Sequence, residues 1–310
     1  MTTRRHFFVT CAAPALALAA AQPALAAAQP APAWRAQFPE LVFGVIPDEN
    51  AAAATERWRG FGEDLSRTLG TRVTVRVASD YAAVIEGQRA GKIHFALYGP
   101  AAFARALMTG VQAEAISIEV ENDGSRGYYS VFHVRANSPF QAIADLRGRN
   151  LGLVDPNSTS GNIVPRFALH QKGIVPEQFF RRVVFTGSHN NAITALQQGT
   201  VDVAANWWNN PQESNLRRME RQGMARYDDF RIIFRSNQIP NSPIAMLATL
   251  PDPLKAAIRE AVLTLPQRSP ELFRRLTDGQ ALTWAPVTNA EFKPIIELNR
   301  FVDNLRRQRN

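Results

Sequence analysis

A run of small polar residues between two apolar segments offers the clearest chemistry in this chain. The apolar stretch that ends at Val154 is followed by Asp155-Pro-Asn, by the hydroxyl groups of Ser158, Thr159 and Ser160, and then by a glycine and a helix-like segment. The first backbone N–H groups of a helix have no partner inside the helix, and the helix dipole attracts negative charge there. Hydroxyl groups both donate and accept, which suits a partly protonated oxyanion. The pattern indicates an anion-binding turn, and a serine-capped helix that binds nothing has the same pattern.

Four other loops at predicted strand ends or helix starts carry groups of a similar kind. These groups are Tyr81 after Ala78-Ser-Asp, Tyr98 after Phe95-Ala-Leu, His189 in Thr186–Asn190, and Asn209 after Asn206-Trp-Trp. Because the carboxyl ends of parallel strands share one edge of a sheet, all five loops are expected to face one cleft. Each residue alone also fits a structural role, as a core tyrosine, a helix cap or a packing residue.

Strand-like and helix-like segments alternate in two series, which predicts two α/β lobes with mostly parallel sheets flanked by helices. The first series has strands at 40–46, 72–78 and 93–97 and helices at 55–69, 81–90 and 101–108. The second has strands at 150–154, 182–185, 201–205 and 230–235 and helices at 162–172, 191–198 and 212–222. Two extended runs, 113–121 and 128–135, stand between the series, and the stretch from 251 onward is expected to be mostly helical. This layout predicts a hinge between the lobes.

The N-terminus has the layout of an export signal. Arg4-Arg5 is followed by Phe-Phe, an Ala- and Leu-rich apolar run, and the small-x-small site Ala24-Leu-Ala26. We therefore expect an export signal at 1–26, cleaved near Ala26, and we expect a twin-arginine route with a Sec signal as the alternative. The single cysteine, Cys11, lies in this segment, so the mature chain is expected to have no disulfide and no thiol chemistry.

Composition excludes several classes of protein. The mature chain keeps about 280 residues, enough for two domains of ordinary size. Removal of the two signal arginines lowers the net charge from +8 to +6, and the arginines are scattered, so nucleic-acid binding is not expected. The sequence has no Gly-x-Ser-x-Gly and no metal-spaced His/Glu cluster, so we expect neither catalysis nor a metal or other cofactor.

Several motifs in the right order resemble one family over nearly the whole mature chain. They are Asp80-Tyr-Ala-Ala-Val-Ile-Glu-Gly, Tyr98-Gly, Asp123-Gly-Ser-Arg-Gly-Tyr-Tyr-Ser, Asp155-Pro-Asn-Ser-Thr-Ser-Gly, Gly187-Ser-His, Val201-Asp-Val-Ala and Ile239-Pro-Asn-Ser-Pro. The chain is similar to the phosphate/phosphite/phosphonate-binding proteins of ABC importers. This resemblance implies a two-lobed type II periplasmic binding fold with a two-stranded hinge, a small phosphorus oxyanion as ligand, and an inner-membrane ABC permease as partner.

The resemblance also implies roles for individual residues. The oxyanion would be held by Tyr81, Tyr98, Ser158, Thr159, Ser160 and His189. Asn209 and Ser242 stand where aminoalkylphosphonate binders carry acids, which favours an amine-free ligand. Acids at Asp48 and Glu49 would restore amine binding if they reach the cleft.

The expected domain organisation follows from these predictions. After the signal and a leader at 27–36, lobe 1 comprises 37–133 and 238–310, and lobe 2 comprises 134–237. We expect a soluble, monomeric periplasmic protein that delivers its ligand to an importer. A sensory protein that presents the bound anion to a membrane receptor is an alternative, and an enzyme on the same two-lobed fold is a further one.

Overall fold

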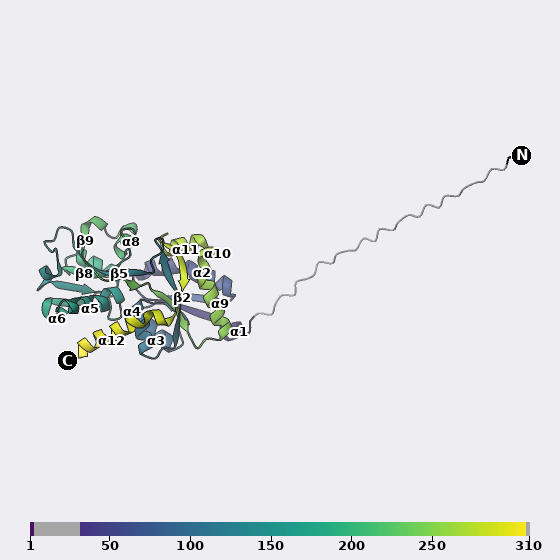
Figure 1. The fold of residues 1–310 in the computed structure, drawn as a ribbon, viewed down its shortest axis with the longest axis horizontal. Coiled ribbons are helices and arrows are strands. Elements are labelled where there is room, and N and C mark those ends of the chain that lie inside the picture. The colour runs from purple at the N-terminus through teal and green to yellow at the C-terminus, as the bar shows by residue number, and fades with distance from the viewer. Residues whose placement is uncertain (3–31, 308–310) are drawn as a thin grey trace. The chain divides into compact units, whose positions relative to one another are not determined.

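The first lobe contains one six-stranded sheet, in the spatial order β12-β4-β11-β3-β1-β2. Figure 1 labels β2 of this sheet, and β5, β8 and β9 of the second sheet. The computed structural model describes residues 1–2 and 32–307, so nearly all of the expected export signal lies outside the described residues. The strands are β1 (Glu40–Val45), β2 (Arg72–Val77), β3 (Phe95–Leu97), β4 (Ala113–Glu121), β11 (Pro243–Leu247) and β12 (Ala281–Pro286). Strands β2, β1 and β3 are parallel, whereas β11 is antiparallel to both β3 and β4. Strand β4 therefore runs in the same direction as β3.

The second lobe has a sheet in the order β10-β5-β8-β6-β7, and β9 also pairs with β5. The strands are β5 (Gly127–Arg135), β6 (Asn150–Leu153), β7 (Arg182–Phe185), β8 (Val203–Trp208), β9 (Phe230–Arg235) and β10 (Ile239–Pro240). Strands β7, β6 and β8 are parallel, and β5 runs antiparallel to β8. The two predicted α/β lobes are confirmed, but both sheets are mixed rather than mostly parallel.

The longer helices begin and end at recognisable sequence signals. The Asn50 side chain caps α2 (Ala51–Leu69) by accepting from Ala52 N, and α2 stops at Gly70, whose φ of 64° suits glycine. The other helices of eight residues or more are α3 (Tyr81–Arg89), α4 (Pro100–Met108), α5 (Val164–Gln171), α7 (His189–Gln197), α9 (Asp252–Leu263) and α12 (Lys293–Arg307). Shorter ones are α1 (Trp34–Gln37), α6 (Pro176–Phe179), α8 (Asn215–Arg221), α10 (Leu265–Arg268) and α11 (Pro270–Leu276). No helix among the described residues is both long and apolar enough to span a membrane.

The chain crosses between the sheets twice, at 122–126 and at 241–242. The two crossings lie side by side, because Asn241 N donates to Arg126 O at 3.0 Å. Strand β5 belongs to the second sheet, so by sheet membership the first crossing comes before residue 127 rather than at the expected boundary after residue 133. Helix α12 also connects the lobes, since it packs on both α4 and α5.

An aromatic cluster fixes α2 against the first sheet and so positions one wall of the cavity described below. Phe43 on β1 lies 5.4 Å from Trp58 and 5.0 Å from Phe61 between ring centroids. Trp284 on β12 packs against the same helix rings, 6.5 Å from Trp58 and 5.5 Å from Phe61. Such pairs contribute roughly 0.5–1.5 kcal/mol each beyond the apolar area that they bury.

Candidate ligand-binding cavity

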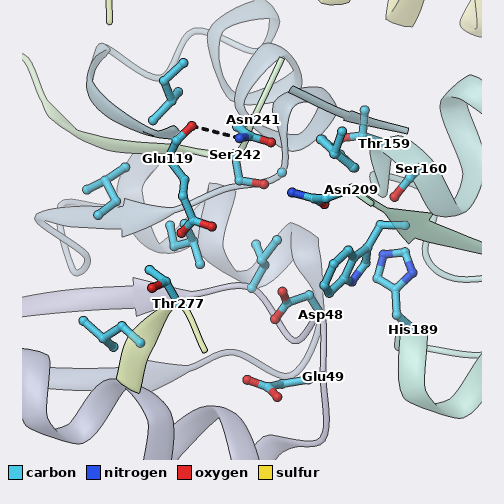
Figure 2. A pocket seen from close by; sticks show the side chains of 18 of the residues that line it. Asp48, Glu49, Glu119, Thr159, Ser160, His189, Asn209, Asn241, Ser242 and Thr277 are labelled. Carbon is cyan, nitrogen blue, oxygen red and sulfur yellow. Dashed lines mark hydrogen bonds between the residues drawn. The ribbon is translucent and has the colours of Figure 1, made fainter. Parts of the chain in front are cut away.

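A cavity of about 130 Å³ lies between the lobes and receives residues from both. Figure 2 shows the carboxylates of Asp48, Glu49 and Glu119 on one side of it and Thr159, Ser160 and His189 on the other. The cavity thus has an end formed mainly by neutral hydrogen-bond donors, which we call the donor end, and an opposite carboxylate end. The donor end comprises Tyr81, Tyr128, Ser158, Thr159, Ser160 and His189, and the carboxylate end comprises Glu49, Glu119 and Glu121. Asp48 lies between the two ends, close enough to Tyr81 and Tyr128 to raise their pKa values.

The serine-rich turn begins a short π-helix, Thr159–Ile163, that continues into α5. Ser158 Oγ accepts from Gly161 N at 3.1 Å, which caps the turn. A Cβ on Gly161 would lie 2.4 Å from the Val154 side chain, so only glycine allows this close approach. Ala101 N of α4 donates to Thr159 Oγ1 at 2.8 Å, which leaves the Thr159 hydroxyl hydrogen free to donate elsewhere.

Two buried tyrosines face this turn from different lobes. Burial raises the pKa of Tyr81 well above its usual range, and its hydroxyl is hydrogen-bonded to Ser158. Burial also raises the pKa of Tyr128 to about 12, and the hydroxyl of Tyr128 interacts with Thr159 and Ser160. Both phenols therefore stay protonated at neutral pH and can donate hydrogen bonds.

His189 is the first residue of α7 and is 3% exposed. Burial lowers the pKa of its imidazole to about 3, so the ring is neutral. Within the described part of the chain its buried Nδ1 has no hydrogen-bond partner. A bound anion would raise this pKa, because an opposite charge stabilises the protonated ring.

Four helical segments begin at this end of the cavity. Their starts are marked by Tyr81, Gly99, Thr159 and His189, all of which line the cavity. Each helix start carries a partial positive charge, so their convergence favours an anion without any formally charged side chain.

The structure separates the two predicted tyrosines. Tyr81 lines the cavity, but Tyr98 does not. The Tyr98 hydroxyl lies 3.0 Å from Gln88 Oε1 on α3, and the next residue, Gly99, takes its expected place at the cavity wall. The prediction placed this chain segment correctly at the cavity wall, but the Tyr98 side chain points toward α3 and away from the cavity. Tyr98 is therefore not supported as an oxyanion ligand.

Tyr128 was missed because the sequence analysis searched the carboxyl ends of parallel strands. Strand β5 is antiparallel to β8, so the start of β5 lies at the edge where β6 and β8 end. The aromatic pair Tyr128-Tyr129 at the start of a strand was the available signal.

Carboxylates gather at the opposite end. Asp48 and Glu49, left open by the sequence, both line the cavity, as do Glu119 and Glu121 at the end of β4. Burial and then the neighbouring Glu49 raise the pKa of Asp48 to about 6. Burial, followed by Glu121, raises the pKa of Glu119 to about 8, and burial raises that of Glu121 to about 7. Glu119 and Glu121 are two residues apart on one strand, so they share a face.

Asn209 also lines the cavity, as the sequence predicted, but its amide has a protein partner. Asn209 Nδ2 donates to Glu121 Oε1, a contact between residues from the two lobes. Asn209 therefore orients a carboxylate of the carboxylate end rather than standing as a free ligand group.

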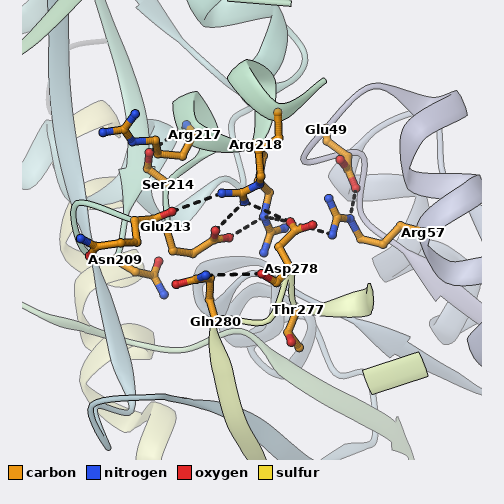
Figure 3. Close-up of polar contacts among 12 residues, drawn as sticks. Glu49, Arg57, Asn209, Glu213, Ser214, Arg217, Arg218, Thr277, Asp278 and Gln280 are labelled. Atoms are coloured by element: carbon orange, nitrogen blue, oxygen red, sulfur yellow. Dashed lines mark hydrogen bonds and ion pairs between the residues drawn. The ribbon is translucent and has the colours of Figure 1, made fainter. Parts of the chain in front are cut away.

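The two arginines of the cavity are engaged by other acids (Figure 3). Arg57 Nε lies 2.8 Å from Glu49 Oε1, and its Nη1 lies 3.1 Å from Asp278 Oδ2. Arg218 Nε lies 2.6 Å from Glu213 Oε1 and 3.3 Å from Asp278 Oδ2. Asp278 thus joins arginines from both lobes, and it is the only non-glycine residue of the described chain with a positive φ, 52°. Asp48, Glu119 and Glu121 have no ion pair among the described residues at salt-bridge distance.

Two α/β lobes, paired crossings and a polar cavity between the lobes define the class of hinged solute-binding proteins. The chain belongs to the family of periplasmic substrate-binding proteins of phosphonate ABC transporters, whose model matches residues 43–292. Proteins of this family are periplasmic substrate-binding components of ABC transporters.

Known proteins agree with this assignment. The chain is 30% identical over 268 residues to the phosphonates-binding periplasmic protein of Escherichia coli, covering 84% of this chain and 76% of that protein. It is similar to the crystal structure of a binding-protein component of an ABC phosphonate transporter from Pseudomonas aeruginosa, with 27% identity, a TM-score of 0.76 and coverage of 85% and 86%. The fold also matches PhnD1 of Prochlorococcus marinus in complex with methylphosphonate, at 21% identity, a TM-score of 0.75 and coverage of 85% and 98%.

The described residues contain no group of three or more His, Cys, Asp or Glu side chains placed to hold a metal ion.

Proposed function

We propose that this protein captures a small phosphorus oxyanion at the donor end of the cavity and delivers it to the permease of an ABC importer. The observation that carries the proposal is the convergence of Tyr81, Tyr128, Thr159, Ser160 and His189, from both lobes, on one end of the cavity. Oxyanion and protein would be held together by hydrogen bonds to the charged ligand, each of which contributes roughly 1.5–3 kcal/mol.

The chemistry of the donors suits phosphonate, phosphite or phosphate. Hydroxyl groups can donate to a fully ionised oxygen and accept from a protonated one, so they tolerate the proton that these anions still carry near neutral pH. The names of several relatives, among them a phosphate-import protein and a probable phosphite-binding protein, agree with this range of ligands.

Calorimetric titration tests the proposal directly. Methylphosphonate, phosphite and phosphate are titrated into the mature protein, with sulfate as a comparison anion that carries no proton at neutral pH. Saturable one-to-one binding of at least one phosphorus oxyanion is expected. Absence of binding for all three would overturn the proposed function.

Transport rather than sensing is the second part of the proposal. We propose that the exported chain, cleaved near Ala26, acts as a monomer and that its liganded form stimulates the ATPase of its permease complex in proteoliposomes. Binding without any stimulation would favour the sensory role. We propose lobe boundaries at the two crossings, near residues 126 and 241, instead of the expected 133/134 and 237/238, because β5 and β10 belong to the second sheet.

A further inference from the structure

Asp48 brings a carboxylate to the part of the cavity where the oxyanion is expected. It follows β1 and lines the cavity, and its backbone oxygen accepts from His189 N at 3.0 Å, a bond between the two lobes. Figure 2 shows the Asp48 side chain between Glu49 and His189. The loop that carries Asp48 is therefore held beside the start of α7, one of the helix starts that favour an anion.

The charge of Asp48 acts on a tyrosine from each lobe. Burial is the main reason why the pKa values of Tyr81 and Tyr128 are raised, and the Asp48 carboxylate contributes to both shifts. Tyr81 begins α3 and Tyr128 is the second residue of β5. Asp48 is therefore close to the space between these two hydroxyl groups.

No cation neutralises this carboxylate at short range. Asp48 has no ion pair at salt-bridge distance in the described chain, since Arg57 and Arg218 are bonded to other acids. Burial, followed by the charge of Glu49, raises the pKa of Asp48 to about 6, and the two arginines oppose this shift only in part. Asp48 is therefore ionised at neutral pH, but it takes up a proton when further negative charge approaches.

The hydroxyl groups of the serine-rich turn are better placed to donate than to accept. Ser158 Oγ already accepts from Gly161 N at 3.1 Å, and Thr159 Oγ1 already accepts from Ala101 N at 2.8 Å. An ionised carboxylate, in contrast, can only accept hydrogen bonds. Asp48 thus adds a charged acceptor to a site that consists mainly of donors.

Such an acceptor distinguishes anions that have the same shape and charge. The monoanion of methylphosphonate carries a P–O–H hydrogen, which it can donate to a carboxylate in a charge-assisted hydrogen bond. Methanesulfonate is also a tetrahedral monoanion, but its oxygens carry no hydrogen. They would face the oxygens of Asp48 with no hydrogen between them, unless Asp48 first took up a proton.

Resting on the proposed function, we propose that Asp48 selects oxyanions that carry a P–O–H hydrogen, because its carboxylate accepts that hydrogen beside the donors of the two lobes. The protein then requires a proton on the ligand, whereas hydroxyl groups alone would only tolerate one. Phosphonates, phosphite and phosphate are favoured in the forms that keep a proton, and sulfonates and sulfate are disfavoured.

The inference predicts how this preference changes with pH. Below its pKa of about 6, Asp48 carries its own proton and can donate it to a sulfonate oxygen. Above that pKa, a sulfonate binds only after Asp48 is protonated, which lowers its affinity about tenfold for each further pH unit. A phosphonate monoanion brings its own proton, so its affinity does not fall for this reason.

Other charged groups near Asp48 do not disturb the comparison. The groups that face it from its own loop and from neighbouring elements are Glu49, Arg57 on α2, Tyr81 on α3, Tyr128 on β5, His189 on α7 and Arg218 on α8. They act alike on two monoanions of the same shape, so their effects cancel in the ratio of the two affinities.

The experiment measures the affinities of methylphosphonate and methanesulfonate by calorimetric titration at pH 5.5 and at pH 7. We expect the ratio of methylphosphonate to methanesulfonate affinity to be about tenfold larger at pH 7 than at pH 5.5. If the site admits phosphate but not the methyl group, phosphate and sulfate form the equivalent pair, with the same expected change.

Two outcomes would overturn the inference and leave the proposed function intact. One is a ratio that stays constant or falls between pH 5.5 and pH 7. The other is a failure of the proton-free anion to bind even at pH 5.5, because protonated Asp48 should admit it. Failure of methylphosphonate, phosphite and phosphate to bind would overturn both the inference and the proposed function.

Variants assign the pH dependence to Asp48. In Asp48→Asn the amide can donate to a sulfonate oxygen at any pH, so the ratio at pH 7 should fall about tenfold and should no longer change with pH. Asp48→Ser is a second variant without a titrating group. A folded Asp48 variant that keeps the wild-type pH dependence would contradict the inference.

Glu114→Gln is the matched control for these variants. Glu114 lies on β4 of the same lobe, where it bonds Lys255 and Arg259, and it does not line the cavity. This protein loses one negative charge, as Asp48→Asn does, but should keep the wild-type pH dependence of the ratio. A loss of that dependence in Glu114→Gln would show that overall charge, rather than the Asp48 carboxylate, is responsible, and would also overturn the inference.

Discussion

The two ends of the cavity recognise charge by different physical means. At the donor end, hydroxyl groups, a neutral imidazole and four helix starts form an anion site with no formally charged donor. At the carboxylate end, Glu119 and Glu121 have no arginine at salt-bridge distance among the described residues, because Arg57 is bonded to Glu49 and Asp278 and Arg218 to Glu213 and Asp278. The difference teaches that fixed dipoles and neutral donors make a site whose own groups keep one protonation state near neutral pH, whereas buried carboxylates make a site whose own charge follows pH.

The largest effect is expected from Thr159→Val at the donor end. This change removes a donor to the ligand and also leaves Ala101 N without its acceptor at 2.8 Å. The two losses together should weaken methylphosphonate binding by about a hundredfold. Calorimetry measures the change, and Thr200→Val, at an exposed position, is the control. A loss under about threefold would show that the oxyanion binds elsewhere.

The second prediction compares Tyr98, which the sequence predicted as a ligand residue, with Tyr128, which lines the cavity in the structure. Tyr128→Phe should weaken binding about tenfold, because one donor to a charged ligand is lost. Tyr98→Phe should leave binding nearly unchanged, because its hydroxyl contacts Gln88 at 3.0 Å outside the cavity. Parallel titrations of both proteins decide the matter. The reverse order of effects would restore Tyr98 as a ligand residue.

A third prediction concerns the ion network between the lobes. Asp278→Asn removes the carboxylate shared by Arg57, Arg218 and Arg221. The lobes should then close less firmly, and affinity for the oxyanion should fall severalfold, by about 1 kcal/mol. High salt should weaken oxyanion binding by the wild type and so reduce the difference between the two proteins, because the ion pairs of the partly exposed Asp278 are screened. Arg59→Gln, which breaks an exposed pair within α2, is the control and should change nothing.

The last prediction concerns stability as a function of pH rather than ligand affinity. The pKa of Glu119 is raised from 4.5 to about 8 in the folded protein by burial and by Glu121. Between these values the unfolded chain releases a proton that the folded chain retains, so the free energy of unfolding falls as pH rises from about 4.5 to about 8. Glu119→Gln should flatten this slope in thermal melts between pH 5 and 8.5.

The control for this measurement is Glu114→Gln, which should keep the wild-type slope. If stability changed with pH to the same extent in the wild type and in Glu119→Gln, the pKa of Glu119 would not be raised in the folded protein, and the prediction would be wrong.

The sequence predicted best where the chemistry is local. Ser158, Thr159 and Ser160 are consecutive residues of a turn whose glycine and following helix can be recognised in the sequence, and all three line the cavity. Most strand ends were also placed to within one residue, but β8 runs on to Trp208, three residues beyond the predicted end at 205. The sequence did not reveal the direction of individual side chains. The Tyr98 side chain points toward α3, and the next residue, Gly99, lines the cavity instead.

The missed residues have a common physical reason. Tyr128 starts an antiparallel strand, so it reaches the binding edge from the opposite direction. Glu119 and Glu121 end β4, whose direction depends on β11, a strand that the sequence analysis did not predict. Strand β12 was missed inside a stretch expected to be helical, and its Trp284 completes the wall. Long-range pairing, rather than local propensity, decided each of these cases.

Some bonds between the lobes involve only protein atoms of the binding loops. Ala101 N reaches Thr159 Oγ1 at 2.8 Å, and His189 N reaches Asp48 O at 3.0 Å. Both bonds must break whenever the cleft opens, so the rates of ligand entry and exit are tied to the rate of opening rather than to diffusion. A variant that weakens only these bonds would exchange its cargo faster at the same chemical selectivity. Residence time and ligand choice are therefore separately adjustable properties of this cleft.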